Sequence, residues 1–247
     1  MKGYRGIILI ALAMAVSATA TANSRDQAQR IHNRLAGVPA DAATLTEMAQ
    51  LIDNNQVAEA AELAMDNPAF YNVTIKQFAT PWTNEAQDVF APLNDYTATI
   101  IGVVRDDVDF RRILYSDLLY VGNTSPAASP SSNAHYQALE DQHADLSTVL
   151  TESSQASQYG TPAEAVAGVL TTRAAANAFF YAGTNRAMLR FTLMNHMCRD
   201  LEQVKDTSRP SDRIRQDVSR SPGGDSRIFR NSCIGCHSGM DPLAQAF

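Results

Sequence analysis

Residues 230–243 read RNSCIGCHSGMDPL and contain Cys233, Cys236 and His237. Two cysteines separated by two residues and followed at once by a histidine form C-x-x-C-H, the attachment sequence of a c-type haem. One helical turn brings both sulfurs to the porphyrin edge that carries the vinyl groups, and the histidine then lies within reach of the iron. The stretch predicts haem c, an iron cofactor, held covalently by Cys233 and Cys236, with His237 as the iron ligand. Gly235 is expected to leave the haem face uncrowded.

Three alternative sites could be built from the same side chains. A dithiol redox pair normally follows a strand in a βαβ unit, whereas this motif follows a loop and helical patterns. A zinc site from Cys198, Cys233, Cys236 and His237 has a permitted ligand set, but the adjacency of its last two members makes tetrahedral ligation awkward. A disulfide between Cys233 and Cys236 would be strained. Haem attachment is therefore the favoured interpretation, with these three as alternatives.

The first 22 residues have the pattern of a secretory signal peptide. Lys2 and Arg5 give a positive start, and Ile7–Val16 is an apolar run shorter than the about 20 residues that a membrane-spanning helix needs. Ala20–Ala22 fits an A-x-A cleavage site, which predicts a cut before Asn23. An uncleaved anchor is the alternative. Because haem c is attached outside the cytoplasm, we expect a periplasmic or otherwise exported protein that does not span the membrane after cleavage.

The composition narrows the class of protein. The chain has 247 residues, of which 45% are apolar and 19% charged, as in ordinary globular proteins. It carries 20 basic and 26 acidic residues, a net charge of -6, so no basic excess exists to hold a phosphate backbone. Three cysteines are too few for a disulfide scaffold of this size. We expect a globular protein that does not bind nucleic acid.

Apolar residues recur at helical spacing along most of the chain, and strict alternation is nowhere long enough to indicate a large sheet. The expected fold class is mainly α, a helical bundle-like body with a C-terminal c-type haem motif. The expected organisation is a signal peptide (1–22), an N-terminal helical region (23–121), a Ser/Pro/Asn loop or linker (122–134), a second helical region (135–210) and the haem c motif segment (211–247).

Three local patterns make sharper predictions. Apolar residues of Phe90–Val104 share one face of a helix that is expected to begin at about Asn84. Thr161–Glu164 predicts a helix start, because it combines a capping Thr, a Pro at the first helical position and a Glu that completes a capping box. Residues 113–121, ILYSDLLYV, are either a short strand or the end of a helix.

The sixth iron ligand is the least determined part of the site. Ten residues follow His237, and the one methionine among them, Met240, is too close to reach the opposite face of the ring, so we expect it to pack under the haem. A distal ligand would have to come from upstream. We therefore predict a weak, upstream or absent sixth ligand.

The expected helix 185–202 is the densest source of upstream ligands. Met194 and Met197 fall near the middle of its apolar arc, where the competing interpretation is core packing. His196 falls just outside the arc, where the competing interpretation is a solvated surface histidine. Cys198 lies on the arc and is expected to be a buried free thiol. These three candidate ligands, Met194, His196 and Met197, are weak ones.

Arginines precede the motif, and guanidinium groups suit the carboxylates of haem propionates. A solvated charged stretch is an equally good interpretation. The residues concerned are Arg213, Arg215, Arg227 and Arg230.

The C-terminal half resembles a family of large exported cytochrome-like proteins first noted in planctomycetes, of unknown function. Its haem module has an Arg-containing lead-in, C-x-x-C-H and then x-x-[IM]-D-P-L, which residues 230–243 match. Weaker similarity covers Arg111–Val121 and Gly168–Cys198. The resemblance implies an exported haem c protein, and the variable Ile/Met position supports packing for Met240. Family chains continue past this point, so a truncated member lacking a downstream ligand is one interpretation of the end at Phe247.

The functional expectation follows from the motif and the signal peptide together. One covalent haem in an exported helical protein predicts electron transfer with a redox partner protein that the sequence does not name. The first alternative is a haem enzyme or sensor with an open distal site for peroxide or a small gas. The second is a non-redox binding protein whose haem staples a small helix. A polar distal pocket would favour the enzyme, and a Met sulfur over the iron would favour the carrier.

Overall fold

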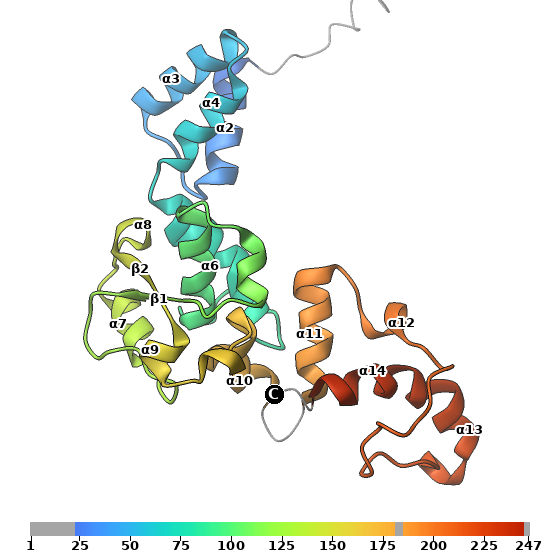
Figure 1. The fold of residues 1–247 in the computed structure, drawn as a ribbon. Coiled ribbons are helices and arrows are strands. Elements are labelled where there is room, and N and C mark those ends of the chain that lie inside the picture. The colour runs from blue at the N-terminus through green and yellow to red at the C-terminus, as the bar shows by residue number, and fades with distance from the viewer. Residues whose placement is uncertain (1–22, 181–184, 245–247) are drawn as a thin grey trace, which may run out of the picture. The chain divides into compact units, whose positions relative to one another are not determined.

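The computed structural model describes residues 23–180 and 185–244, and the fold that they form is mainly helical, as the sequence predicts (Figure 1). The expected signal peptide, residues 1–22, lies outside the described residues. The chain divides into two compact units, one up to Phe70 and one from Tyr71 onward. No helix in the described ranges has the length and apolar character needed to cross a membrane.

The first unit consists of α2 (Ser24–Leu35), α3 (Ala42–Asp53) and α4 (Val57–Met65), which contact one another pairwise. Asn23 caps α2 by accepting a hydrogen bond from the Asp26 amide, and Asp41 caps α3 in the same way. The apolar cluster that joins the three helices has mostly small buried members, which lets the helices pack closely. They are Ala28, Met48, Ile52, Ala60 and Ala64.

The second unit combines ten helices of the described residues with one small sheet. The helices are α5 (Lys76–Ala79), α6 (Asp95–Arg105), α7 (Ala134–Asp141), α8 (Leu146–Val149), α9 (Gln155–Tyr159), α10 (Arg173–Phe179), α11 (Asn185–Met197), α12 (Leu201–Val204), α13 (Ser226–Ile228) and α14 (Ile234–Ala244). Shorter 3₁₀ segments are Thr80–Thr83, Phe110–Leu114, Ala163–Ala165, Gly168–Thr171 and Pro222–Gly224, and π-helical turns are Phe70–Ile75 and Phe229–Cys233. Strands β1 (Leu119–Gly122) and β2 (Leu150–Ser153) pair antiparallel, with Leu119 opposite Ser153.

Helix α6 forms the centre of the second unit. All of its residues from Asp95 to Val103 are buried, as is typical of a helix surrounded by its own domain. Its buried Thr99 hydroxyl donates to the Asp95 carbonyl and accepts from the Tyr120 amide of β1. At Gly102 a side chain would collide with the ring of Tyr120, so the close approach of α6 to β1 requires glycine.

Two local predictions are wrong. The helix expected from about Asn84 begins only at Asp95, where the Asn94 side chain accepts from the Thr97 amide and caps α6. Asn84 instead bonds the carbonyls of Thr80 and Asp88 with its side-chain amide, and this closes a loop in place of a helical turn.

The helix expected from Thr161 is also wrong, because only a 3₁₀ turn, Ala163–Ala165, forms there. The chain then turns at Gly168, whose φ is 52° and whose α-carbon lies against the Ile113 carbonyl, so a helix cannot continue through it. Residues 113–121 are predicted to be either a short strand or the end of a helix, and part of each occurs. A 3₁₀ segment ends at Leu114, and β1 begins at Leu119.

Candidate functional site

The C-x-x-C-H residues lie where the π-helical turn Phe229–Cys233 passes into α14. The Asp225 side chain accepts from the Arg227 amide and starts this helical run. Positions i, i+3, i+4 and i+7 share one face of a helix, which places Cys233, Cys236, His237 and Met240 together. Met240 is buried, as its expected packing role requires.

The two motif cysteines are free thiols, each half-buried. Cys233 packs against the apolar cluster of Ile214, Val218 and Phe229. The Cys236 sulfur lies 4.0 Å from the carbonyl oxygen of Leu201. Burial, and then the nearby Glu202 carboxylate, raise the pKa of the Cys236 thiol. Neither thiol is therefore committed to a disulfide, and both remain available for thioether bonds.

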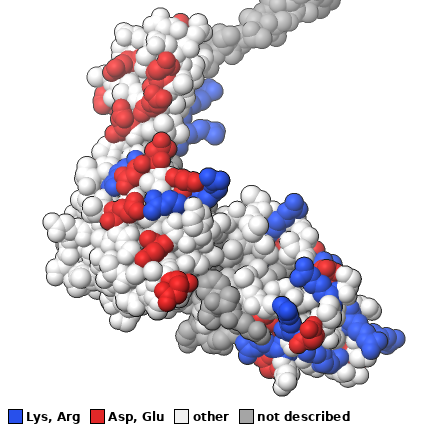
Figure 2. Space-filling model, in the orientation of Figure 1, with Lys and Arg blue, Asp and Glu red and all other residues white. Residues whose placement is uncertain are grey.

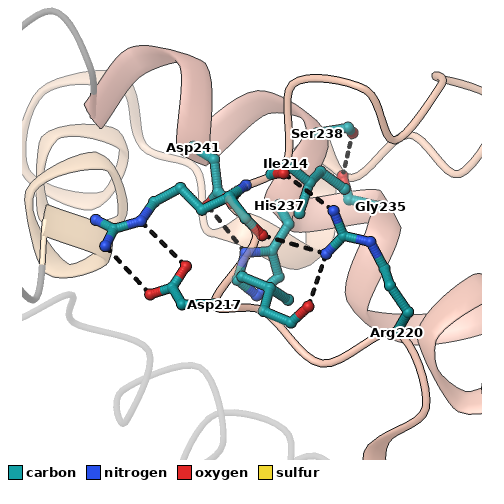
Figure 3. A network of polar contacts seen from close by, with 9 residues as sticks. Ile214, Asp217, Arg220, Gly235, His237, Ser238 and Asp241 are labelled. Carbon is teal, nitrogen blue, oxygen red and sulfur yellow. Dashed lines mark hydrogen bonds and ion pairs between the residues drawn. The ribbon is translucent and has the colours of Figure 1, made fainter.

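His237 is held by a carboxylate on its own helix. Its Nδ1 lies 2.9 Å from Oδ1 of Asp241, four residues later, and Asp241 is only 1% exposed (Figure 3). An ionised carboxylate only accepts, so Nδ1 is the donor of this hydrogen bond, and in the neutral ring Nε2 then keeps its lone pair. No described residue bonds Nε2. A protonated Nδ1 held by a carboxylate is the arrangement of a metal-ligating histidine.

The other oxygen of Asp241 binds the loop in front of α13. Oδ2 accepts a hydrogen bond of 2.9 Å from the Arg215 amide. Arg220 organises this loop, because its guanidinium donates to the carbonyls of Val218 and Ile214 at 2.7 and 3.0 Å (Figure 3). The same guanidinium lies 4.8 Å from the ring centroid of Phe229. The loop that supports Asp241 is thereby fixed to the helical run that carries the motif.

Gly235 is buried against a neighbouring loop. It contacts the loop 205–207, since its carbonyl accepts from the Asp206 amide at 2.9 Å. A side chain at Gly235 would lie 3.1 Å from the Thr207 methyl group and 3.2 Å from Cβ of Lys205. The missing side chain leaves room for this loop, and the expected role of Gly235 at the haem face stays a prediction.

A small cleft of about 180 Å³ opens beside Cys236. Its apolar walls come from α11 and α12, and its lining includes Leu189, Leu193, Leu201, Val204 and Cys236. The cleft is smaller than the roughly 300–1,000 Å³ of a pocket that encloses a cofactor, so it offers apolar surface at the edge of a haem and does not enclose one. The donor set fits haem c, with two free thiols one helical turn apart and a histidine whose Nε2 is unbound.

His196 is not the solvated surface histidine that was expected. Its Nε2 lies 2.6 Å from the Tyr96 hydroxyl, and its ring packs edge-on against Trp82 with centroids 5.4 Å apart. Burial lowers the pKa of His196 to about 4, so the ring is neutral where it shares this hydrogen bond with the Tyr96 hydroxyl. Helical spacing missed this contact because Tyr96 lies a hundred positions earlier in the chain.

The end of α11 corrects two further expectations. Cys198 is exposed, because it adopts a left-handed φ of 50° while the Arg199 amide bonds the Leu193 carbonyl, and this closes the helix. The predicted helix 185–202 therefore ends at Met197, and the apolar arc does not extend to Cys198. Met197 is 58% exposed, so it does not fill the core, whereas Met194 is half-buried.

The alternative zinc site does not assemble. Within residues 23–180 and 185–244, no group of three or more His, Cys, Asp or Glu side chains is arranged to hold a metal ion. Two of the four arginines considered for propionates are paired with neighbours, Arg215 with Asp217 and Arg227 with Asp225.

The residue that sequence reasoning missed is Asp241. Its signal was present, because an acidic residue four positions after a histidine on one helix faces that histidine. Comparisons of the chain with protein-family models, with curated proteins and with solved structures return no match. Function is therefore argued from the site itself.

Proposed function

We propose that the chain is an exported c-type cytochrome-like protein that binds one haem through Cys233 and Cys236, uses His237 as axial ligand and transfers electrons. The observation that carries this proposal is the combination on one helix face of two free thiols and an imidazole with Nε2 unbound. Haem c, when bound, supplies a one-electron iron couple. The partner protein is a donor or acceptor outside the cytoplasm.

The chain's own residues have separate tasks in this proposal. Cys233 and Cys236 fix the ring by thioether bonds, and Asp241 fixes the orientation of the His237 imidazole. Leu189 and Leu193 provide apolar surface beside the Cys236 thiol. A firmly oriented ligand changes little between oxidation states, which favours electron transfer.

A second candidate function is small-molecule binding on the distal side of the haem. It is favoured because the Nε2 of His196 already bonds Tyr96, which leaves Met194 and Met197 as the candidate ligands on α11. Without one of these, the iron would have five ligands and an open site. This function predicts rapid carbon monoxide binding by the reduced protein, whereas a low-spin spectrum that resists carbon monoxide supports the carrier.

The test is expression of the full chain, signal included, in cells that contain the haem c maturation factors. We expect haem to stay with the chain after acid-acetone extraction and on denaturing gels. Cys233→Ala and Cys236→Ala should each impair attachment by removing one thioether. Cys198→Ala is the matched control and should attach haem normally, because Cys198 is exposed beyond α11. An exported haem-free chain with stoichiometric zinc would overturn the proposal.

A further inference from the structure

We propose that Asp241 is a positioning residue that sets the donor strength of His237, so that its negative charge lowers the reduction potential of the haem iron. This inference rests on the proposed function and names the residue that regulates the potential of the same site. It concerns the chain's own hydrogen bond between Nδ1 of His237 and Oδ1 of Asp241, 2.9 Å long.

The first step is that the hydrogen bond is built into the fold. Both residues lie on α14 four positions apart, so the backbone of one helix turn fixes their separation. The Asp241 side chain is 2% exposed and that of His237 is 14% exposed, so water competes little for either group. A hydrogen bond to an ionised acceptor in such a setting is about twice as strong as a neutral one.

The second step is that the charge of Asp241 is not neutralised by a cation. Among the described residues, its only partners are the His237 ring and the Arg215 amide. The two guanidiniums of the supporting loop point to other groups, since Arg215 pairs with Asp217 and Arg220 binds backbone carbonyls (Figure 3). Within the described part of the chain, the imidazole is therefore the one side chain that bonds this carboxylate.

The third step is chemical. A carboxylate that accepts from the outer nitrogen of a ligating histidine raises the basicity of the ligand. A more basic ligand stabilises Fe(III) relative to Fe(II), because it donates more charge to the more positive ion. The potential is then lower than with a neutral amide or a carbonyl at the same place.

A purely structural role for Asp241 makes a different prediction. Its Oδ2 ties the Arg215 amide to α14, so losing the carboxylate could loosen the loop 214–220 without any change in the iron. Stability and haem content would then fall, while the potential of the chains that still hold haem stayed constant. The potential is the measurement that separates the two roles.

The experiment is spectroelectrochemical titration of the purified haem-loaded chain, with haem content measured alongside. Asp241→Asn keeps the shape and removes the charge. We expect its potential to rise by at least about 59 mV, a tenfold change in the one-electron equilibrium. Asp241→Glu restores a carboxylate and should restore most of the wild-type potential. Asp217→Asn removes an exposed charge from the same loop and is the matched control, with no shift expected.

The outcomes separate the two proposals. A wild-type chain without covalent haem overturns the proposed function. A haem-loaded Asp241→Asn chain with the wild-type potential overturns the role of Asp241 alone. If Asp241→Asn holds no haem, the pair Asp241→Glu and Asp241→Gln decides, since they differ only in charge. A higher potential in the Gln variant supports the role, and equal potentials overturn it.

Discussion

Two carboxylates of the second unit are almost completely buried, and they differ in what they hold. Asp95, at the start of α6, is 0% exposed and accepts from the amides of Arg173 and Ala174 at 2.6 and 3.0 Å. It also accepts from the Tyr159 hydroxyl at 3.0 Å. Burial raises its pKa. All of these partners belong to the scaffold, since they fix the beginning of α10 and one aromatic side chain to the central helix.

Asp241 divides its two oxygens between the scaffold and the site. One accepts from a backbone amide, and the other accepts from an imidazole whose second nitrogen is unbound. A buried carboxylate is costly wherever it lies, so its partners indicate its purpose. Both oxygens of Asp95 therefore stabilise the fold. In Asp241 one oxygen stabilises the fold, and the other orients an imidazole that can bind a metal.

The regions around these carboxylates also differ in their cores. The body of the second unit has a continuous apolar core that includes Tyr96, Ile100 and Leu118. The C-terminal segment, residues 199–244, has the small cluster of Ile214, Val218 and Phe229. Lys and Arg side chains gather on this part of the surface (Figure 2).

The charges of the C-terminal segment do not replace the missing core. Its ion pairs join near neighbours in sequence, such as Arg209 with Asp206 and Arg227 with Asp225, and are largely exposed. Exposed pairs of this kind contribute about 0–1 kcal/mol each. With so small a core, we expect the segment to need a covalent or metal link for full stability. A haem on Cys233 and Cys236 would supply apolar surface at that place.

The largest expected effect therefore comes from removing the covalent link between the haem and the C-terminal segment. In the Cys233→Ala/Cys236→Ala chain we expect no covalent haem. Amide protection should fall to near the unfolded level across residues 199–244, while α6 keeps its protection because its core does not involve the cysteines. Hydrogen exchange followed by mass spectrometry measures both regions in one experiment.

The control for this prediction is Cys198→Ala, which removes an exposed thiol and should leave the exchange pattern of the haem-loaded chain unchanged. Equal protection of residues 199–244 with and without haem would break the comparison, because it would show that the small apolar cluster suffices.

The second effect concerns Asp95. The Arg173 amide bonds Oδ2 of Asp95 and the Ala174 amide bonds Oδ1, so Asp95→Asn places a donor opposite one of these two buried amides whichever way the new side chain turns. We expect a loss of roughly 3 kcal/mol in the free energy of unfolding of the body. Haem content should not change. Urea unfolding and the pyridine haemochrome spectrum give the two readouts.

The opposite pattern for Asp95→Asn, with unchanged stability and reduced haem content, would contradict its assignment to the scaffold. Asp88→Asn offers a control in the same region, because its carboxylate serves only the exposed Phe90 amide.

The sequence predicted the elements whose determinants are local. The mainly helical class is confirmed because apolar spacing is a property of each helix, and the C-x-x-C-H residues lie on helical backbone because the spacing itself is one turn. Haem attachment stays a prediction. Helix starts were missed where a distant or irregular contact decided them, as at Asn84, whose side chain closes a loop.

The surroundings of α11 could not be predicted, for a tertiary reason. A helical wheel assumes that polar side chains face water, but Asn195 bonds the Trp82 carbonyl and His196 bonds Tyr96. Both bonds join segments about a hundred residues apart. A wheel also continues past the end of the helix, which is why it placed the exposed Cys198 in the core.

The smallest expected effect tests that buried contact through its dependence on pH. The pKa of His196 is lowered to about 4 in the folded chain, against an ordinary value of about 6.5 when unfolded. The unfolded chain therefore binds an extra proton between these values. The stabilisation is complete above about pH 6.5 and is lost as the pH falls towards 4.

For the wild type this loss amounts to roughly 2 kcal/mol between pH 7.5 and 4.5. In His196→Gln the glutamine can still accept from the Tyr96 hydroxyl but does not titrate. Over the same pH range, the free energy of unfolding of this variant should therefore fall by roughly 2 kcal/mol less than that of the wild type. Trp82, the chain's single tryptophan, packs against His196 and reports unfolding by fluorescence. His143→Gln changes an exposed histidine and should behave as the wild type does. Identical pH dependence in the wild type and His196→Gln would show that His196 is not held neutral at this contact.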